Sequence, residues 1–232
     1  MLEVTEELIA DVPEPVQRSL RRSGVVGRRI PDVVTVWQEG RIRTSPERRW
    51  LPFTAREQYR LDPPGFVWSA ALKMAGITLG RATDSLNDGH GRMRVRLLGL
   101  FTVVDAAGPE MDQGSLMRWL NETMWFPAAW ATDVISWEPI DAVSAVGAVR
   151  SGGSEVRGEF RFDPSGRIVD FLADRYRDVG ERFEMTPWCT PITGHDQFEG
   201  IEVPTTGSAV WLMEGGTFEY IQIRVTEIRS TP

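Results

Sequence analysis

The 232-residue sequence has one cysteine, two histidines and one lysine, and each shortage excludes a class of protein. A single cysteine, Cys189, cannot form an internal disulfide. Metal sites need clustered His, Cys or carboxylate ligands, and His90, His195 and Cys189 are too few and too scattered to indicate one. We therefore expect no metal, and Lys73 is the only candidate for lysine chemistry.

Motifs for nucleotide binding and nucleophilic catalysis are also missing. The glycine-rich segments at 76–80 and 89–91 lack the following helix and the lysine of a phosphate-binding loop. No Gly-x-Ser-x-Gly elbow is present, and Cys189 is better explained as a buried small residue than as a nucleophile. We expect no cofactor.

Excess positive charge and long apolar runs are lacking as well. The net charge is −7 and the pI about 5.0, which argues against nucleic-acid binding. The arginines at 18–29 and 41–49 are interpreted as solvated faces and ion pairs. The longest apolar run, 97–104, is strand-length, so no membrane span is expected. The acidic N-terminus does not resemble a signal peptide, which favours a cytoplasmic protein, and the sequence specifies no oligomeric state.

Tryptophan, by contrast, is abundant. The chain has nine tryptophans against three tyrosines, and they are spread along its whole length. Tryptophan combines a large apolar area with one N–H that needs a partner. Most should fill the core, and several are candidates to line an apolar cavity.

Short strand patterns separated by turn residues occupy most of the chain. Hairpin signals recur at 87–91 and at 163–166, and strands do not alternate with helices as in a parallel sheet. The pattern predicts a mainly antiparallel α+β protein of one domain, 1–232, with β meanders at 33–104 and 134–229. About ten or more strands in one sheet must curl, and we expect a strongly curved half-barrel.

Helices are predicted at two places. Residues 13–23 should form a short N-terminal helix, which begins at a proline and ends before Gly24. Residues 112–127 should form a central helix around which the sheet wraps. Residues 50–55 are expected to be a connection, because Pro52 is unfavourable in a central strand.

The central helix has two contrasting faces at about 100° per residue. One is apolar and should pack on the sheet. The other carries a cation, an amide, a carboxylate and an indole at i, i+3, i+4 and i+7, which suits the wall of a pocket. These residues are Arg118, Asn121, Glu122 and Trp125.

Further candidates join this polar face. We expect Trp50, Phe53, Arg118, Asn121, Trp125 and Trp188 to bind a ligand. Glu122 is a candidate acid or base, since burial among indoles would raise its pKa, with Arg175 and Tyr176 as catalytic partners. The alternative to this role is a structural one, in which Glu122 is the ion-pair partner of Arg118 or Arg175.

Several motifs are similar to those of an uncharacterised bacterial family catalogued as a domain of unknown function. They are Pro-Val-Gln-Arg-x-Leu-Arg-Arg-Ser-Gly at 15–24, Trp-x-Pro-Phe-Thr-Ala at 50–55, Glu-x-x-Trp-Phe-Pro at 122–127, Trp-Glu-Pro-Ile-Asp at 137–141, Asp-Arg-Tyr-Arg at 174–177 and Thr-Pro-Trp at 186–188. The resemblance spans nearly the whole chain and implies no activity. The order of elements also resembles the lipoprotein-carrier fold, an open half-barrel with an apolar cavity.

Three functions follow as hypotheses. The first is binding of an apolar or amphipathic small molecule in an aromatic-lined interior. The second is a cofactor-independent cyclase, isomerase or hydrolase that acts on a hydrophobic metabolite through Glu122. The third is a protein-interaction domain that uses the open edge of the sheet.

Overall fold

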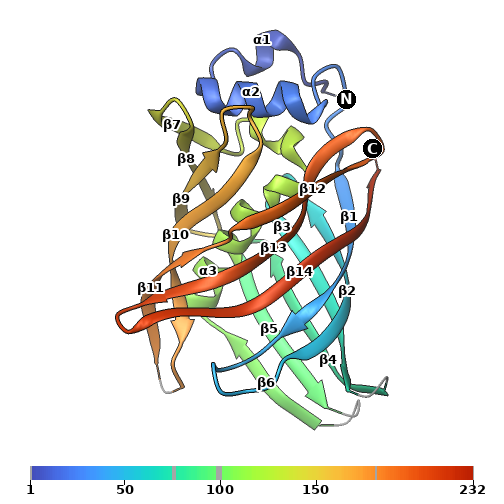
Figure 1. Cartoon of the computed structure of the whole chain (residues 1–232), viewed down its shortest axis with the longest axis vertical. Coiled ribbons are helices and arrows are strands. Elements are labelled where there is room, and N and C mark those ends of the chain that lie inside the picture. Colours follow the sequence, from blue (N-terminus) through green and yellow to red (C-terminus); the bar gives the residue numbers. More distant parts are fainter. Residues whose placement is uncertain (1, 75–76, 98–100, 181, 232) are drawn as a thin grey trace.

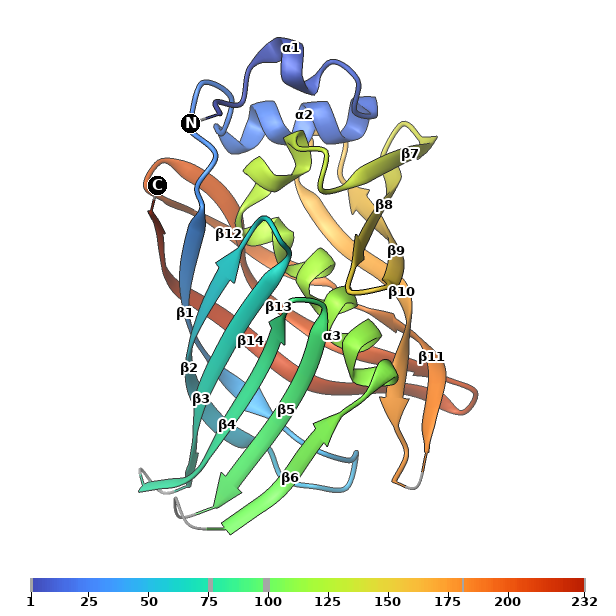
Figure 2. The ribbon, with the colours of Figure 1, turned by 180° about the vertical axis from the view of Figure 1, so that it is seen from behind.

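A curled antiparallel sheet surrounds one long helix in the computed structural model, which describes residues 2–74, 77–97, 101–180 and 182–231. The helix α3 (Pro109–Glu122) runs along the inner face of the sheet (Figures 1 and 2). The predicted half-barrel of antiparallel strands wrapped on a central helix is confirmed.

Six strands precede α3 and form what we term the first wall, each paired with its neighbours in the chain. They are β1 (Val33–Ile42), β2 (Leu51–Arg60), β3 (Gly65–Met74), β4 (Ile77–Asn87), β5 (His90–Leu97) and β6 (Phe101–Ala107). Asp88 and Gly89 both have positive φ, 50° and 82°, so the predicted turn between β4 and β5 is a two-residue turn of the kind that twisted hairpins prefer.

Eight strands follow α3 and form the second wall. They are β7 (Ser136–Asp141), β8 (Ser144–Ser151), β9 (Ser154–Phe162), β10 (Ile168–Asp178), β11 (Phe183–Cys189), β12 (Ile192–Phe198), β13 (Ile201–Met213) and β14 (Gly216–Thr231).

The two walls meet where β1 pairs with β14, so the first and last strands are neighbours. Among the described residues the sheet has 14 strands in the order β6-β5-β4-β3-β2-β1-β14-β13-β11-β10-β9-β8-β7, with β12 paired to β13. The walls also touch at two hairpin tips. A Cβ added to Gly152 would lie 2.5 Å from the Cα of Gly89, so this approach requires glycine.

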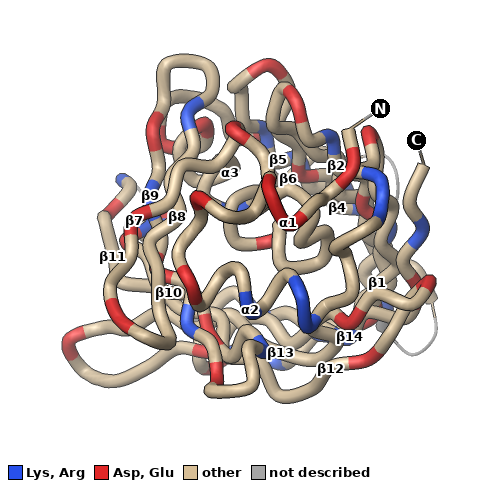
Figure 3. The backbone as a smooth tube through the Cα atoms, turned by 90° about the horizontal axis from the view of Figure 1, so that it is seen from above, with Lys and Arg blue, Asp and Glu red and all other residues tan. Residues whose placement is uncertain are grey.

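Two short helices lie across one end of the half-barrel, as the view from above shows (Figure 3). The predicted N-terminal helix is present as α2 (Glu14–Ser23), preceded by an unpredicted single turn, α1 (Glu6–Ile9). Thr5 is the N-cap of α1, because its side chain accepts a hydrogen bond from the backbone N–H of Leu8 at 3.2 Å.

The central helix begins and ends earlier than the predicted range of 112–127. Pro109 occupies its first turn, where a missing N–H is harmless, and Glu122 is its last α-helical residue. The chain then tightens into two 3₁₀ turns, Thr123–Trp125 and Pro127–Ala131. Within the described residues no helix is both long and apolar enough to cross a membrane.

The expected connection at 50–55 is wrong, because Leu51–Arg60 form strand β2. Pro52 is tolerated near the start of the strand. It lies opposite Arg41 of β1, whereas pairing with β3 begins one residue later, at Phe53 and Leu72. A proline that faces no partner on its N–H side removes no ladder hydrogen bond.

Two prolines lie in different positions of the second wall. The chain divides at Thr190–Pro191 into β11 and β12. Pro204 instead lies within the single long strand β13, opposite His195.

The end of the half-barrel beneath α2 is filled with aromatic side chains. Trp119 and Trp130 are fully buried, and each indole N–H has a partner: the carbonyl oxygen of Arg60 at 3.0 Å and the hydroxyl of Thr123 at 2.8 Å. Trp130 also packs on Phe160 at 5.4 Å. These tryptophans are core residues, as most were expected to be, and they close one end of the interior.

Candidate ligand-binding site

A cavity of about 890 Å³ occupies the rest of the interior, between α3 and the inner faces of both walls. Its lining is mostly apolar and combines strands that are far apart in the sequence. Apolar lining residues include Leu72, Met93, Val95, Val103, Trp68, Trp125, Trp188, Ile192, Ala209 and Ile221.

One row of side chains on α3 and on the 3₁₀ turn that follows it faces this cavity. Arg118, Asn121, Glu122 and Trp125, which the helical spacing placed on a common face, all line it. The opposite side of the helix packs into the core, where Leu116 and Leu120 are almost completely buried. The periodicity of the helix therefore predicted which side chains face the interior.

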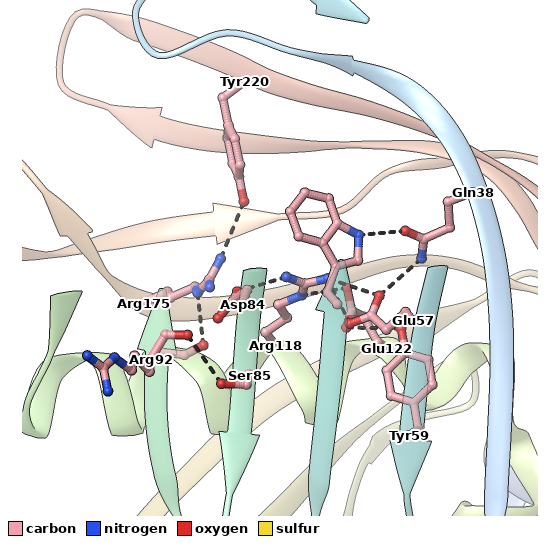
Figure 4. A network of polar contacts seen from close by, with 12 residues as sticks. Gln38, Glu57, Tyr59, Asp84, Ser85, Arg92, Arg118, Glu122, Arg175 and Tyr220 are labelled. Atoms are coloured by element: carbon pink, nitrogen blue, oxygen red, sulfur yellow. Dashed lines mark hydrogen bonds and ion pairs between the residues drawn. The ribbon is translucent and has the colours of Figure 1, made fainter. Parts of the chain in front are cut away.

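Arg118 is the centre of a buried ionic cluster (Figure 4). Its Nη2 lies 2.8 Å from Oε1 of Glu57 on β2, and its Nη1 lies 2.8 Å from Oδ2 of Asp84 on β4. Its Nε lies 2.8 Å from Oε1 of Glu122, one turn further along α3. The guanidinium thus joins the helix to two strands of the first wall.

Neutral groups hold the carboxylates in turn. The Tyr59 hydroxyl donates to Oε2 of Glu122 at 3.2 Å, and Nε2 of Gln38 donates to Oε2 of Glu57 at 3.2 Å. The indole N–H of Trp68 donates to Oε1 of Gln38 at 2.9 Å. These bonds fix the orientation of the cluster.

Burial decides the protonation of this cluster. Desolvation raises the pKa of Glu57 well above its ordinary value and also raises the pKa of Glu122, although the charge of Arg118 opposes both shifts. Three ionised carboxylates beside one guanidinium would leave uncompensated negative charge in a buried site, which is strongly unfavourable. Burial therefore favours the protonated form of Glu57 and Glu122, and the charge of Arg118 favours the ionised form.

Arg175, on β10, lies against the helix in quite different surroundings. Its Nε donates to the carbonyl oxygen of Gly114 on α3 at 3.2 Å, and its Nη1 donates to the Tyr220 hydroxyl at 3.3 Å. The guanidinium lies 5.0 Å from the centre of the Trp188 ring. In the described part of the chain no carboxylate oxygen lies within 4.0 Å of it.

The remaining predicted site residues lie outside the cavity lining. Trp50 lies beneath the guanidinium of Arg43, 4.5 Å from ring centre to Cζ, and Phe53 is buried against Trp68 with ring centres 5.7 Å apart. Tyr176 follows Arg175 on β10, so its side chain leaves the opposite face of the strand. The structure brings Arg118, Asn121, Glu122, Trp125, Arg175 and Trp188 together around the cavity.

Glu57 and Asp84, the partners of Arg118, were not among the predicted site residues. Both occupy the inward positions of alternating strands. Residues Phe53, Ala55, Glu57 and Tyr59 are all buried, and the residues between them are exposed. A carboxylate at a buried position of an alternating strand can be recognised from the sequence, and it predicts a buried cation nearby.

The connection between β1 and β2 also contributes charge to the cavity. Arg43, Arg48 and Arg49 line it together with Glu47. The sequence interpretation treated this run as a solvated face, because nothing local shows that the connection borders a cavity.

The scattered His and Cys residues have ordinary surroundings. Burial raises the pKa of the Cys189 thiol to about 11, which keeps it protonated near neutral pH. His195 lies 2.9 Å from the carbonyl oxygen of Ile168, and His90 is exposed beside Asp112. Over the residues that the structure describes, no group of three or more His, Cys, Asp and Glu is arranged to hold a metal ion.

The fold is shared with a solved protein of low sequence similarity. A DUF1329 family protein from Desulfovibrio piger superposes with a TM-score of 0.51 at 9% identity, covering 93% of this chain and 91% of its own. A LolA superfamily protein from Nitrosomonas europaea gives a TM-score of 0.47 at 11% identity, with 94% of each chain covered.

Sequence comparison adds a family but no activity. No curated protein matches the chain by sequence. The model of a family of unknown function, DUF6544, matches residues 2–223, which is nearly the whole chain, so the protein belongs to the DUF6544 family.

Proposed function

We propose that this protein binds an apolar or amphipathic small molecule in the cavity between α3 and the curled sheet. The observation that supports this most is the cavity itself, about 890 Å³ and lined mainly by aliphatic and indole side chains. Cavities that hold small molecules typically measure about 300–1,000 Å³ and carry a few fixed polar groups on an apolar lining.

The asymmetry of the interior supports the same proposal. One end is closed by Trp119 and Trp130, whereas the other is bordered by the β1–β2 connection and its arginines. A ligand with an apolar body would bury it among the side chains of both walls. At about 25 cal/mol per Å² of apolar surface, this burial supplies most of the binding free energy.

Filling the cavity tests the proposal. Val95 lines it, so Val95→Trp should place an indole in the space and weaken the binding of a neutral hydrophobic dye such as Nile red at least about tenfold, or about 1.4 kcal/mol. The matched control is Val169→Trp, because Val169 is 37% exposed on β10 and does not line the cavity.

Fluorescence titration and thermal unfolding of all three proteins measure the result. Equal dye affinity of the wild type and a folded Val95→Trp variant would show that the dye binds elsewhere. Native mass spectrometry of protein purified from its own host adds a direct search for a retained molecule. The absence of any dye binding by the wild type would reject the proposal.

Cofactor-independent catalysis is a second candidate, favoured by one observation. Glu122 lines the cavity, and burial raises the pKa of its carboxyl group, as an acid–base catalyst requires. Both of its oxygens, however, are engaged by Arg118 and Tyr59. Conversion of a retained ligand, followed by mass spectrometry and lost in Glu122→Gln, would favour catalysis over binding alone.

A further inference from the structure

The cavity carries an excess of positive charge in a chain whose net charge is −7. Setting aside Arg118 and its carboxylate partners, the charged lining residues are four arginines and one carboxylate. They are Arg43, Arg48, Arg49, Arg175 and Glu47. A cationic interior in an acidic protein favours a ligand of negative charge.

Of the two arginines that join α3 to the sheet, only Arg175 is available to such a ligand. Arg118 already has three carboxylates at 2.8 Å. Arg175 has only neutral partners among the described residues: a backbone carbonyl, a phenol and an indole ring. A partly buried guanidinium without an anion forgoes the charge-assisted hydrogen bonds that it forms best.

The hydroxyl of Tyr220 provides an independent observation at the same place. It accepts a hydrogen bond from Nη1 of Arg175 at 3.3 Å (Figure 4). It accepts another from the indole N–H of Trp188 at 3.2 Å. A phenol has one donor, and its two contacts are both accepted, so its own O–H remains to be donated. Tyr220 and Arg175 both line the cavity.

From this geometry we propose that the ligand is an anionic amphiphile. Its carboxylate or phosphate group accepts hydrogen bonds from Arg175 and from the hydroxyl of Tyr220, and its apolar body lies along the aliphatic and indole lining. The inference rests on the proposed function and adds the charge and the anchoring residues of the ligand.

A series of ligands with equal chain length tests the charge. Dodecanoate, dodecyl phosphate, dodecanol and dodecyltrimethylammonium compete with Nile red for the wild-type protein. The three ionic compounds are used below their micelle concentrations, and dodecanol below its solubility limit. Both anions should bind at least about tenfold more tightly than dodecanol, because charge-assisted hydrogen bonds are stronger than neutral ones. The cation should bind more weakly than the alcohol. A preference between the two anions identifies the head group.

Variants test the anchor. Arg175→Gln should retain dodecanol and dye affinity and lose the preference for anions, Arg175→Lys should keep part of it, and Tyr220→Phe should reduce it severalfold. Arg157→Gln is the control, because Arg157 pairs with Glu138 and does not line the cavity. Thermal unfolding confirms that each variant is folded, and Tyr220→Phe remains informative if Arg175→Gln does not fold.

The outcomes separate the two proposals. If neither dye nor dodecanol binds the wild type, the proposed function fails and the inference fails with it. If both bind but dodecanoate and dodecyl phosphate bind no tighter than dodecanol, the inference alone is overturned. The same holds if Arg175→Gln and Tyr220→Phe both keep the full preference for anions.

Discussion

Two arginines join α3 to the sheet, one from the helix itself and one from the second wall. Arg118 is surrounded by Glu57, Asp84 and Glu122 and joins the helix to the first wall. Arg175 reaches the helix from the second wall, where it meets the carbonyl oxygen of Gly114 and no described carboxylate. The groups around each arginine therefore separate their roles. Arg118 holds the structure together through its carboxylate partners, and Arg175, which has neutral partners, is the group that we propose binds a ligand.

The two walls also differ in the side chains that they direct toward the interior. The first wall supplies buried carboxylates, whereas the second supplies a chain of aromatic contacts. Successive ring centres along that chain lie 4.8, 6.0, 6.4 and 5.7 Å apart. Its members are Phe160, Phe171, Trp188, Trp211 and Tyr220. The first wall therefore holds the helix through ion pairs, and the second wall carries the aromatic surface on which we propose that a ligand lies.

The largest expected effect comes from removing the cation that joins α3 to the first wall. Arg118→Met should lower the free energy of unfolding by about 3–5 kcal/mol, because it leaves buried carboxylates without their partner. Arg175→Met, the matched change in the second wall, should cost clearly less, because it breaks hydrogen bonds to neutral groups and leaves no buried charge unpaired. Urea unfolding followed by tryptophan fluorescence measures both. Equal losses would remove the distinction between the two arginines.

A smaller effect concerns the pH dependence of stability. The pKa of Glu57 is raised in the folded protein, so the folded state keeps a proton that the unfolded chain releases near pH 4.5. Stability from this group is complete below that pH and is lost as the pH rises through the folded pKa, by about 1.4 kcal/mol per pH unit within that window. Glu57→Gln cannot titrate and should lose less stability over the same range.

Unfolding free energies of both proteins at pH 4 to 8 check this expectation. Glu122, whose pKa is also raised, still titrates in the variant, so the dependence should weaken without vanishing. Parallel curves for the two proteins would mean that Glu57 has the same pKa in the folded and unfolded states, because the charge of Arg118 compensates its burial.

The smallest expected effect lies in the second wall. The hydroxyl of Thr190 donates to Oδ1 of Asn121 on α3 at 2.8 Å, and both side chains are buried. Thr190→Val should cost about 1 kcal/mol, the net value of one neutral hydrogen bond. Thr190→Ser keeps the hydroxyl and serves as the control. A loss as large as that of Arg118→Met would contradict the view that the first wall is the anchor.

Local patterns predicted much of this molecule. The alternation of strand residues and the hairpin turns gave the antiparallel half-barrel, and the helical period placed Arg118, Asn121, Glu122 and Trp125 on the cavity side. These features depend on neighbours within a few residues, which a single sequence displays.

Such local patterns do not predict contacts between segments that are distant in the sequence. The separation from Arg118 to Glu57 is 61 residues, and no spacing rule connects a helix to a strand so far away. The role of Arg175 depends likewise on Tyr220, 45 residues further along. Trp50 and Phe53 show the converse case. They were expected to bind a ligand, whereas Trp50 lies beneath Arg43 and Phe53 packs on Trp68, outside the lining of this cavity.

The pairing of β1 with β14 also has a consequence for how the protein folds. Val33 lies opposite Thr231, so the two walls cannot join along this seam before β14 has been made. Until they join, the inner faces of both walls, which carry buried tryptophans, are open to water. Contacts of such long sequence separation form slowly, and exposed strand edges invite aggregation, so this protein is most vulnerable to aggregation before β1 and β14 have paired.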